Sequence, residues 1–221
     1  LWNDPQLISA ALLSLQIGAI AATIALVLGT LCAVALVRFR RFRGRTVFQG
    51  TVSAPLVMPD VITGLALLLL FVAMESLIGW PRGRGMLTII IAHATFCTAY
   101  VAVVVQSRLA DMDLALEEAA MDLGASPVRV FFDITLPIIA PALISGWLLA
   151  FTLSLDDLVI ASFVSGPGAS TLPMVIFSKV KLGVSPEVNA LATIIIGAVA
   201  LGVVVFTLLQ MRRPRAKKAA A

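Results

Sequence analysis

The stretch "EEAAMDLGAS", Glu117 to Ser126, is a polar segment in a chain that is 60% hydrophobic and only 13% charged. Six of the twelve acidic residues lie between Asp111 and Asp133, and long uncharged segments flank this region on both sides. A soluble domain of 221 residues needs far more polar surface than this composition supplies. We therefore expect a membrane protein whose acidic patch lies outside the lipid.

The uncharged segments predict the fold class. A transmembrane helix needs about 20 predominantly apolar residues, and five segments can supply that length. None shows the two-residue alternation of a membrane β-barrel, so the backbone must satisfy its hydrogen bonds within helices. The sequence predicts an all-α, polytopic transmembrane bundle. The five expected spans are Ile8–Val37, Pro55–Leu77, Met86–Ser107, Ile138–Phe163 and Val188–Met211.

Basic residues predict the orientation of these spans. If the acidic patch and the two large basic clusters face the cytoplasm, twelve of the sixteen basic residues lie there, as the positive-inside rule favours. The C-terminus is then cytoplasmic, and the clusters contact membrane lipid rather than nucleic acid. The twelve residues are Arg38, Arg40, Arg41, Arg43, Arg45, Arg108, Arg129, Arg212, Arg213, Arg215, Lys217 and Lys218.

The N-terminal segment does not have the pattern of a signal peptide. The chain begins with Leu1, and no basic segment precedes the first apolar run. We expect a fragment whose native N-terminus carried at least one further span, the sixth. Cys32 and Cys97 lie within apolar runs, where we expect buried small side chains with neither a disulfide nor a metal site.

The inner loop, Arg108–Leu136, is predicted to be two short helices with a sharp corner between them. Asp113 can cap the first helix, and Gly124 suits the left-handed position that ends it. Ser126 followed by proline then starts the second helix, "VRVFFDIT", which we expect to end at Pro137. This pattern favours a docking surface for another protein over a solvated linker, because a plain linker needs no such corner.

The loop and the segment after it carry a specific motif. "EEAAMDLGASPVRVFFDITLPII", Glu117–Ile139, resembles the EAA loop of the permease subunits of ABC importers. The seven matching positions are Glu118, Ala119, Ala120, Gly124, Ile134, Leu136 and Pro137.

This resemblance implies a single type 1 ABC transmembrane domain over residues 1–221, in the inner membrane of a bacterium. It implies that the inner loop seats in a cleft of a cytoplasmic ATPase subunit. Further implied partners are a second ATPase subunit, a second permease chain and a periplasmic binding protein. The residues predicted to couple to the ATPase are Glu117, Glu118, Ala119, Ala120, Asp122 and Gly124.

The sequence contains no Walker motif, so this chain does not hydrolyse ATP by itself. The expectation is a transport subunit and not an enzyme, without a cofactor of its own. ATP and Mg²⁺ would bind to the partner ATPase subunits.

Two further segments narrow the subclass. Pro55–Leu65 and Leu148–Ile194 are similar to the spermidine and putrescine permeases of the same family. The resemblance implies import of polyamines by alternating access. The sequence leaves open an importer permease for another small solute, such as an amino acid.

A pair of carboxylates, Asp156 and Asp157, lies within a predicted span. An ionised aspartate costs about 2.5–3.5 kcal/mol at the centre of a membrane helix, so such residues face a cavity or a partner. Thr152 shares a helix face with Asp156, and Ser154 shares another with Asp157. These faces lie about 100° apart, so the two carboxylates cannot face one point unless the helix is broken.

The favoured hypothesis is that the pair binds the ammonium groups of a polyamine along its path. The alternatives are an ion pair with a neighbouring subunit and a helix-end cap. For His93, a hydrogen bond across a helix interface is favoured over a proton relay. Two rival functions remain, an ion-coupled secondary transporter that uses His93 and the acidic pair, and a structural scaffold.

Overall fold

A computed structural model describes residues 5–39, 41–182, 193–194, 196–197 and 200–201. The chain divides into two compact units, one of residues 6–175 and one of residues 1–5 with 176–221. In the second unit, the described residues from 176 onwards are helical. The predicted span Val188–Met211 lies outside the described residues except for six positions. The rest of the fold concerns the unit 6–175.

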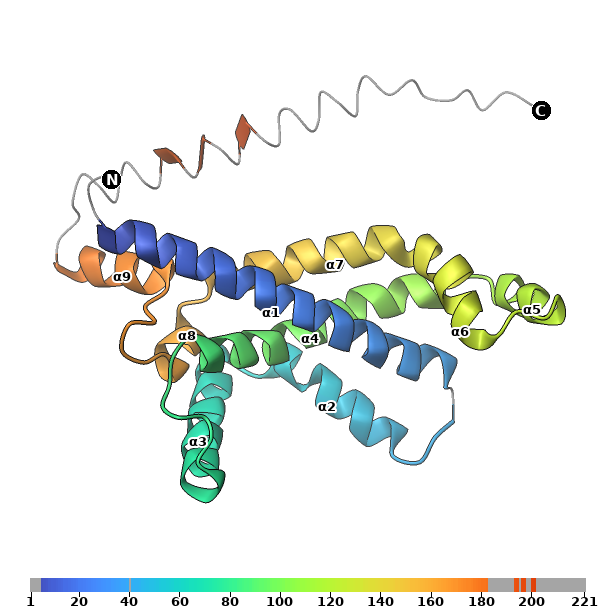
Figure 1. The fold of residues 1–221 in the computed structure, drawn as a ribbon, viewed down its shortest axis with the longest axis horizontal. Coiled ribbons are helices and arrows are strands. Elements are labelled where there is room, and N and C mark those ends of the chain that lie inside the picture. Colours follow the sequence, from blue (N-terminus) through green and yellow to red (C-terminus); the bar gives the residue numbers. More distant parts are fainter. Residues whose placement is uncertain (1–4, 40, 183–192, 195, 198–199, 202–221) are drawn as a thin grey trace. The chain divides into compact units, whose positions relative to one another are not determined.

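Every regular element of the described residues is a helix, which confirms the all-α prediction for that part of the chain (Figure 1). Four helical segments are long and apolar enough to cross a membrane, namely Pro5–Arg38, Asp60–Ile78, Met86–Ala110 and Pro127–Asp156. The elements are α1 Pro5–Arg38, α2 Arg45–Val57, α3 Asp60–Ile78, α4 Met86–Ala110, α5 Ala115–Asp122, α6 Pro127–Val130, the π-helix η1 Phe131–Thr135, α7 Leu136–Asp156, α8 Val159–Val164 and α9 Leu172–Leu182.

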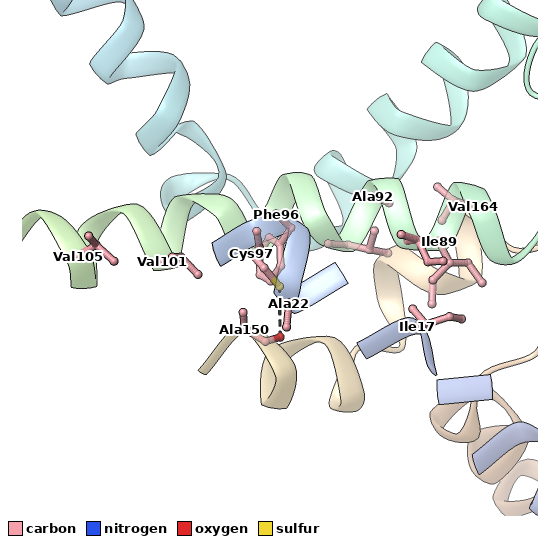
Figure 2. Close-up of a cluster of buried hydrophobic side chains, with 14 of the residues drawn as sticks. Ile17, Ala22, Ile89, Ala92, Phe96, Cys97, Val101, Val105, Ala150 and Val164 are labelled. Atoms are coloured by element: carbon pink, nitrogen blue, oxygen red, sulfur yellow. Dashed lines mark hydrogen bonds between the residues drawn. The ribbon is translucent and has the colours of Figure 1, made fainter. Parts of the chain in front are cut away.

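The core of this unit forms around α4, which packs along α7 and also touches α8 and α2. Figure 2 shows α4 side chains such as Ile89, Cys97 and Val101 directed toward α1, α7 and α8. The Cys97 thiol donates a hydrogen bond to the Ala150 carbonyl oxygen of α7 at 3.4 Å, the dashed line in that figure. Both cysteines are free; Cys97 is buried, as predicted, whereas Cys32 is only half-buried.

Small residues let α1 approach α4 and α7 closely. A Cβ atom on Gly29 would lie 2.7 Å from the Val101 Cγ1 of α4, and one on Gly18 would lie 3.2 Å from the Phe151 ring of α7. Alanines at 22, 25 and 33 are also fully buried on α1. Small residues at such positions are typical of packed transmembrane helices, where close backbone approach replaces the hydrophobic effect.

The predicted span Pro55–Leu77 is wrong at its start, because the helix breaks at Met58 and Pro59. Met58 is extended (φ −79°, ψ 135°), as residues before proline usually are, and α3 begins only at Asp60. Asp60 lies in the first turn of α3, where a carboxylate is favoured by the helix dipole.

The prediction of a second short helix ending at Pro137 is also wrong. Helix runs without interruption from Pro127 to Asp156, and the wider π-helix η1 lies within it. A proline inside an α-helix clashes with the carbonyl four residues before it, here that of Asp133. In η1 the Leu136 N–H bonds to the Phe131 carbonyl oxygen, five residues back, and this wider turn accommodates the proline.

The predicted span Ile138–Phe163 is interrupted as well. Helix α7 ends at Asp156, Asp157 is extended (φ −66°, ψ 121°), and α8 begins at Val159. The following segment, which lies between two predicted spans, contains the helix α9. A proline at its second position, Pro173, suits a helix start, and this signal was missed.

Candidate functional site

The corner of the inner loop has the predicted geometry. Gly124 has φ +89°, in the left-handed region that glycine adopts without strain. The Ser126 hydroxyl accepts a hydrogen bond from the Arg129 N–H at 3.4 Å, and Pro127 opens α6. Asp113 Oδ1 accepts the Ala115 N–H at 3.0 Å at the start of α5. These local contacts make the loop an ordered helix, corner and helix.

The outer surface of α5 and the corner is open and partly apolar. Leu123 is 90% exposed, and Leu116 and Met121 are also exposed. Of the residues predicted to couple to an ATPase, Glu118, Ala119, Asp122 and Gly124 are exposed and Ala120 is half-buried. An exposed helix that carries both apolar and acidic side chains has the composition of a surface that docks into a groove.

Glu117 has a different place from the other residues of this group. Its Oε1 accepts a hydrogen bond from Arg38 Nη2 at 2.8 Å and one from Thr135 Oγ1 at 2.6 Å. Its side chain is only 14% exposed, so it faces α1 and η1 within the chain. Sequence reasoning missed Arg38 as its partner, because the whole basic cluster was interpreted as a lipid-facing topology signal. Arg45 of that cluster also has an internal partner, the Leu36 carbonyl oxygen at 3.3 Å.

The second candidate site lies where α7 gives way to α8. His93 of α4 is 1% exposed, and its Nδ1 lies 2.7 Å from the Ser154 hydroxyl. Its Nε2 lies 3.1 Å from Asp157 Oδ2. The prediction that His93 hydrogen-bonds across a helix interface is therefore confirmed.

Asp157 caps the helix that follows the break. Its Oδ1 accepts the Ile160 N–H at 3.2 Å, and its Oδ2 accepts the Ala161 N–H at 2.7 Å. With the His93 contact, its carboxylate has three partners within the chain, and the side chain is 9% exposed. The predicted alternative of a helix-end cap applies to Asp157.

Asp156 is placed differently, because it ends α7 and is exposed. Thr152, one turn earlier, is also exposed, and its hydroxyl bonds to the Leu148 carbonyl oxygen of the same helix at 2.8 Å. The carboxylate of Asp60, in the first turn of α3, is near enough to repel the like charge of Asp156. The four predicted pathway residues thus separate into an inward-facing pair, the buried Ser154 and the half-buried Asp157, and an exposed pair, Thr152 and Asp156.

The break changes what the acidic pair can do chemically. A regular helix would have kept both carboxylates on the span surface, about 100° apart. Instead Asp157 caps α8 and contacts His93, and Asp156 is the one exposed carboxylate of this pair. Among the described residues, no group of three or more histidine, cysteine or acidic side chains is arranged to hold a metal ion.

The described residues form an all-helical fold with several apolar spans, an ordered polar loop between two of them and a broken span, which is the architecture of a polytopic membrane protein. The chain belongs to the family of binding-protein-dependent transport system inner membrane components, whose model matches residues 9–218. It is therefore a multi-pass membrane protein of the ABC importer permease class.

Curated relatives share most of the chain. The putrescine transport system permease protein PotI of Escherichia coli K12 is 69% identical over 201 residues, which cover 91% of this chain and 72% of that protein. The spermidine/putrescine transport system permease protein PotC of Haemophilus influenzae is 46% identical over 213 residues, covering 96% of this chain and 80% of that protein.

Two solved structures share the fold. An amino acid ABC transporter crystallised with histidines aligns over 95% of this chain and 94% of its own, with a TM-score of 0.62 and 20% identity. A bacterial ABC transporter involved in alginate import aligns over 96% of this chain and 77% of its own, with a TM-score of 0.68 and 20% identity. At this identity the likeness concerns the fold alone.

Proposed function

We propose that this chain is the permease subunit of an ATP-driven importer that carries putrescine or spermidine into the cytoplasm by alternating access. The observation that carries the proposal is the 69% identity to a putrescine permease over 91% of the chain. Residues 1–221 would act as one transmembrane domain in a bacterial inner membrane, with the C-terminus in the cytoplasm. The chain itself would not be an enzyme.

The proposed complex contains a second permease chain, two cytoplasmic ATPase subunits that bind ATP and Mg²⁺, and a periplasmic polyamine-binding protein. The exposed face of α5 would seat in a groove of one ATPase. Glu118 and Asp122 would make charged contacts there, and Leu123 would supply apolar area. ATP binding and the loaded binding protein would each favour a different state of the spans, which is the requirement for coupled transport.

The substrate path is proposed to pass Asp156. A polyamine ammonium group leaving water needs a carboxylate or an aromatic face to replace its hydration. Asp156 and Thr152 are exposed on α7, and Asp60 on α3 adds negative potential nearby. Asp157 and Ser154 would shape the path indirectly, by fixing the helix break from which Asp156 projects.

The test is uptake of labelled putrescine and spermidine into proteoliposomes that hold the full-length chain with its second permease, ATPase and binding protein. A Gly124→Asp variant provides the uncoupled comparison, since an aspartate at φ +89° strains the corner. ATP-dependent uptake that this variant abolishes would support both the substrate and the coupling loop.

The other outcomes separate the rival functions. ATP-dependent activity without polyamine accumulation would keep the importer and discard the substrate. Uptake that needs no ATPase and collapses with an uncoupler would favour an ion-coupled secondary transporter.

A further inference from the structure

Three residues distant in the sequence meet at the C-terminal end of α1. Arg38 lies in the last turn of α1 and donates to Glu117 Oε1 of α5 at 2.8 Å. Thr135 of η1 donates to the same carboxylate oxygen at 2.6 Å. The other terminal nitrogen of Arg38 lies 3.5 Å from the Leu109 carbonyl oxygen of α4. We call Arg38, Glu117 and Thr135 the clasp.

The clasp connects α5 with three of the four candidate spans. Arg38 belongs to α1 and contacts α4, and Thr135 belongs to the helical segment Pro127–Asp156. A cavity of about 460 Å³ opens beside it, with Val34 of α1, Met121 of α5 and Phe131 of η1 among its lining. Apolar packing between these helices is therefore incomplete here, so the hydrogen bonds of the clasp contribute more to holding α5 against the spans.

Because the clasp is largely buried, removing one of its partners costs more than breaking an ordinary surface ion pair, since the other charge is left buried without a partner. The Arg38 and Glu117 side chains are 18% and 14% exposed, and Thr135 is 3% exposed. The same loop holds a second ion pair, Arg129–Asp133, with N to O at 3.1 Å but side chains 75% and 61% exposed. Exposed pairs of that kind contribute little and are screened by salt. The second pair therefore serves as a matched control.

The clasp and the docking surface lie on different faces of the same short helix. Glu117 points to α1 and η1, whereas Glu118, about 100° further round α5, is exposed. A force applied to the exposed face reaches the spans through the short chain connections at the two ends of α5 and through the contacts that fix its opposite face. In this chain Glu117 makes two such contacts from one oxygen atom.

We propose that Glu117 is a positioning residue that transmits displacement of α5 to α1 and to the Pro127–Asp156 helix, and that it does not contact the ATPase. This inference rests on the proposed function of the chain as a coupled importer subunit. Without the clasp, α5 would follow the ATPase while the spans lag, so ATP would be hydrolysed with less transport.

The experiment measures putrescine uptake and ATP hydrolysis in the reconstituted complex and compares uptake per ATP. The variants are Glu117→Gln, Arg38→Gln, Thr135→Val and the charge-swapped pair R38E/E117R, with Asp133→Asn as the control. We expect each of the first two to lower uptake per ATP about fivefold, and Thr135→Val to lower it less. The charge swap should recover most of the loss, and the control should match the wild type.

Copurification of the ATPase distinguishes coupling from docking. If Glu117 positions the helix, Glu117→Gln retains the ATPase as well as the wild type does. Loss of the ATPase in this variant would mean direct contact and would overturn the proposal. Unchanged uptake per ATP would overturn it too. If the single variants and the charge swap all fail to assemble, the pair has a folding role only and the proposal is wrong.

A second readout keeps this test independent of the substrate. Phe39 is 64% exposed directly after α1, so Phe39→Cys in a Cys32→Ala background reports movement of this end of α1 through its reactivity with a maleimide. Cys97 is fully buried and gives little background. If the wild-type complex imports no polyamine, the proposed substrate fails. The clasp is then tested by whether Glu117→Gln removes the ATP-dependent change in reactivity, and a change that persists would overturn it.

Discussion

Replacing Asp157 by alanine should destabilise the protein, whereas replacing the adjacent Asp156 should impair transport without destabilising it. The two residues differ by one position and by their surroundings. Asp157 has three hydrogen-bonding partners and is 9% exposed, and Asp156 is exposed at the end of α7.

The magnitude follows from the contacts that Asp157→Ala removes. Loss of a helix cap costs about 1 kcal/mol. His93, 1% exposed, keeps only its Ser154 partner, and a buried polar group left without a hydrogen bond costs about 1–3 kcal/mol. The sum is about 2–4 kcal/mol, which lowers the melting temperature of a chain of this length by about 8 °C. Asp156→Ala removes an exposed carboxylate, for which changes within about 0.5 kcal/mol are usual.

The assay is thermal unfolding of the detergent-solubilised complex, followed by putrescine uptake in proteoliposomes at a temperature where both variants are folded. Asp156→Ala should lower uptake about tenfold, the equivalent of one lost charged contact to an ammonium group. Equal melting temperatures for Asp157→Ala and wild type would refute the assignment of Asp157 as a structural cap. Wild-type uptake by Asp156→Ala would refute its place on the substrate path.

Three other substitutions test the packing and the loop. Gly29→Ala places a Cβ atom 2.7 Å from the Val101 side chain and should lower the free energy of unfolding by about 1–3 kcal/mol, measured by thermal unfolding. Val101→Ala should restore part of this loss, and an unchanged stability of Gly29→Ala would contradict the close approach of α1 to α4. Gly124→Ala forces a residue with a side chain into φ +89° and should destabilise the corner by about 1–2 kcal/mol. We expect weaker copurification of the ATPase with this variant, and equal copurification would argue against a fixed corner. Leu123→Asp should leave unfolding unchanged, because Leu123 is 90% exposed, and should reduce ATPase binding; retained binding would remove this residue from the docking surface.

Local sequence patterns predicted the corner of the inner loop, although not where its second helix ends. The Gly124 corner and the Ser126–Pro127 start each depend on contacts within a few residues, so composition and spacing suffice to predict them. The apolar runs similarly predicted the described spans, with errors at their ends. The breaks at Met58–Pro59 and Asp157 were missed because their apolar surroundings continue on both sides, and hydropathy does not register a backbone interruption.

The sequence by itself determined that this is an all-helical, multi-pass membrane protein of the ABC importer permease class, because apolar length and a seven-position motif are local properties of the chain. The chain has two pairs of adjacent acidic residues, Glu117–Glu118 and Asp156–Asp157, and only the tertiary structure decided which member of each pair is exposed. Glu117 and Glu118 separate through Arg38 of α1, and Asp156 and Asp157 separate through His93 of α4. Those partners lie 79 and 64 residues away from the acid they contact, and only the folded packing of the helices brings them within hydrogen-bonding distance.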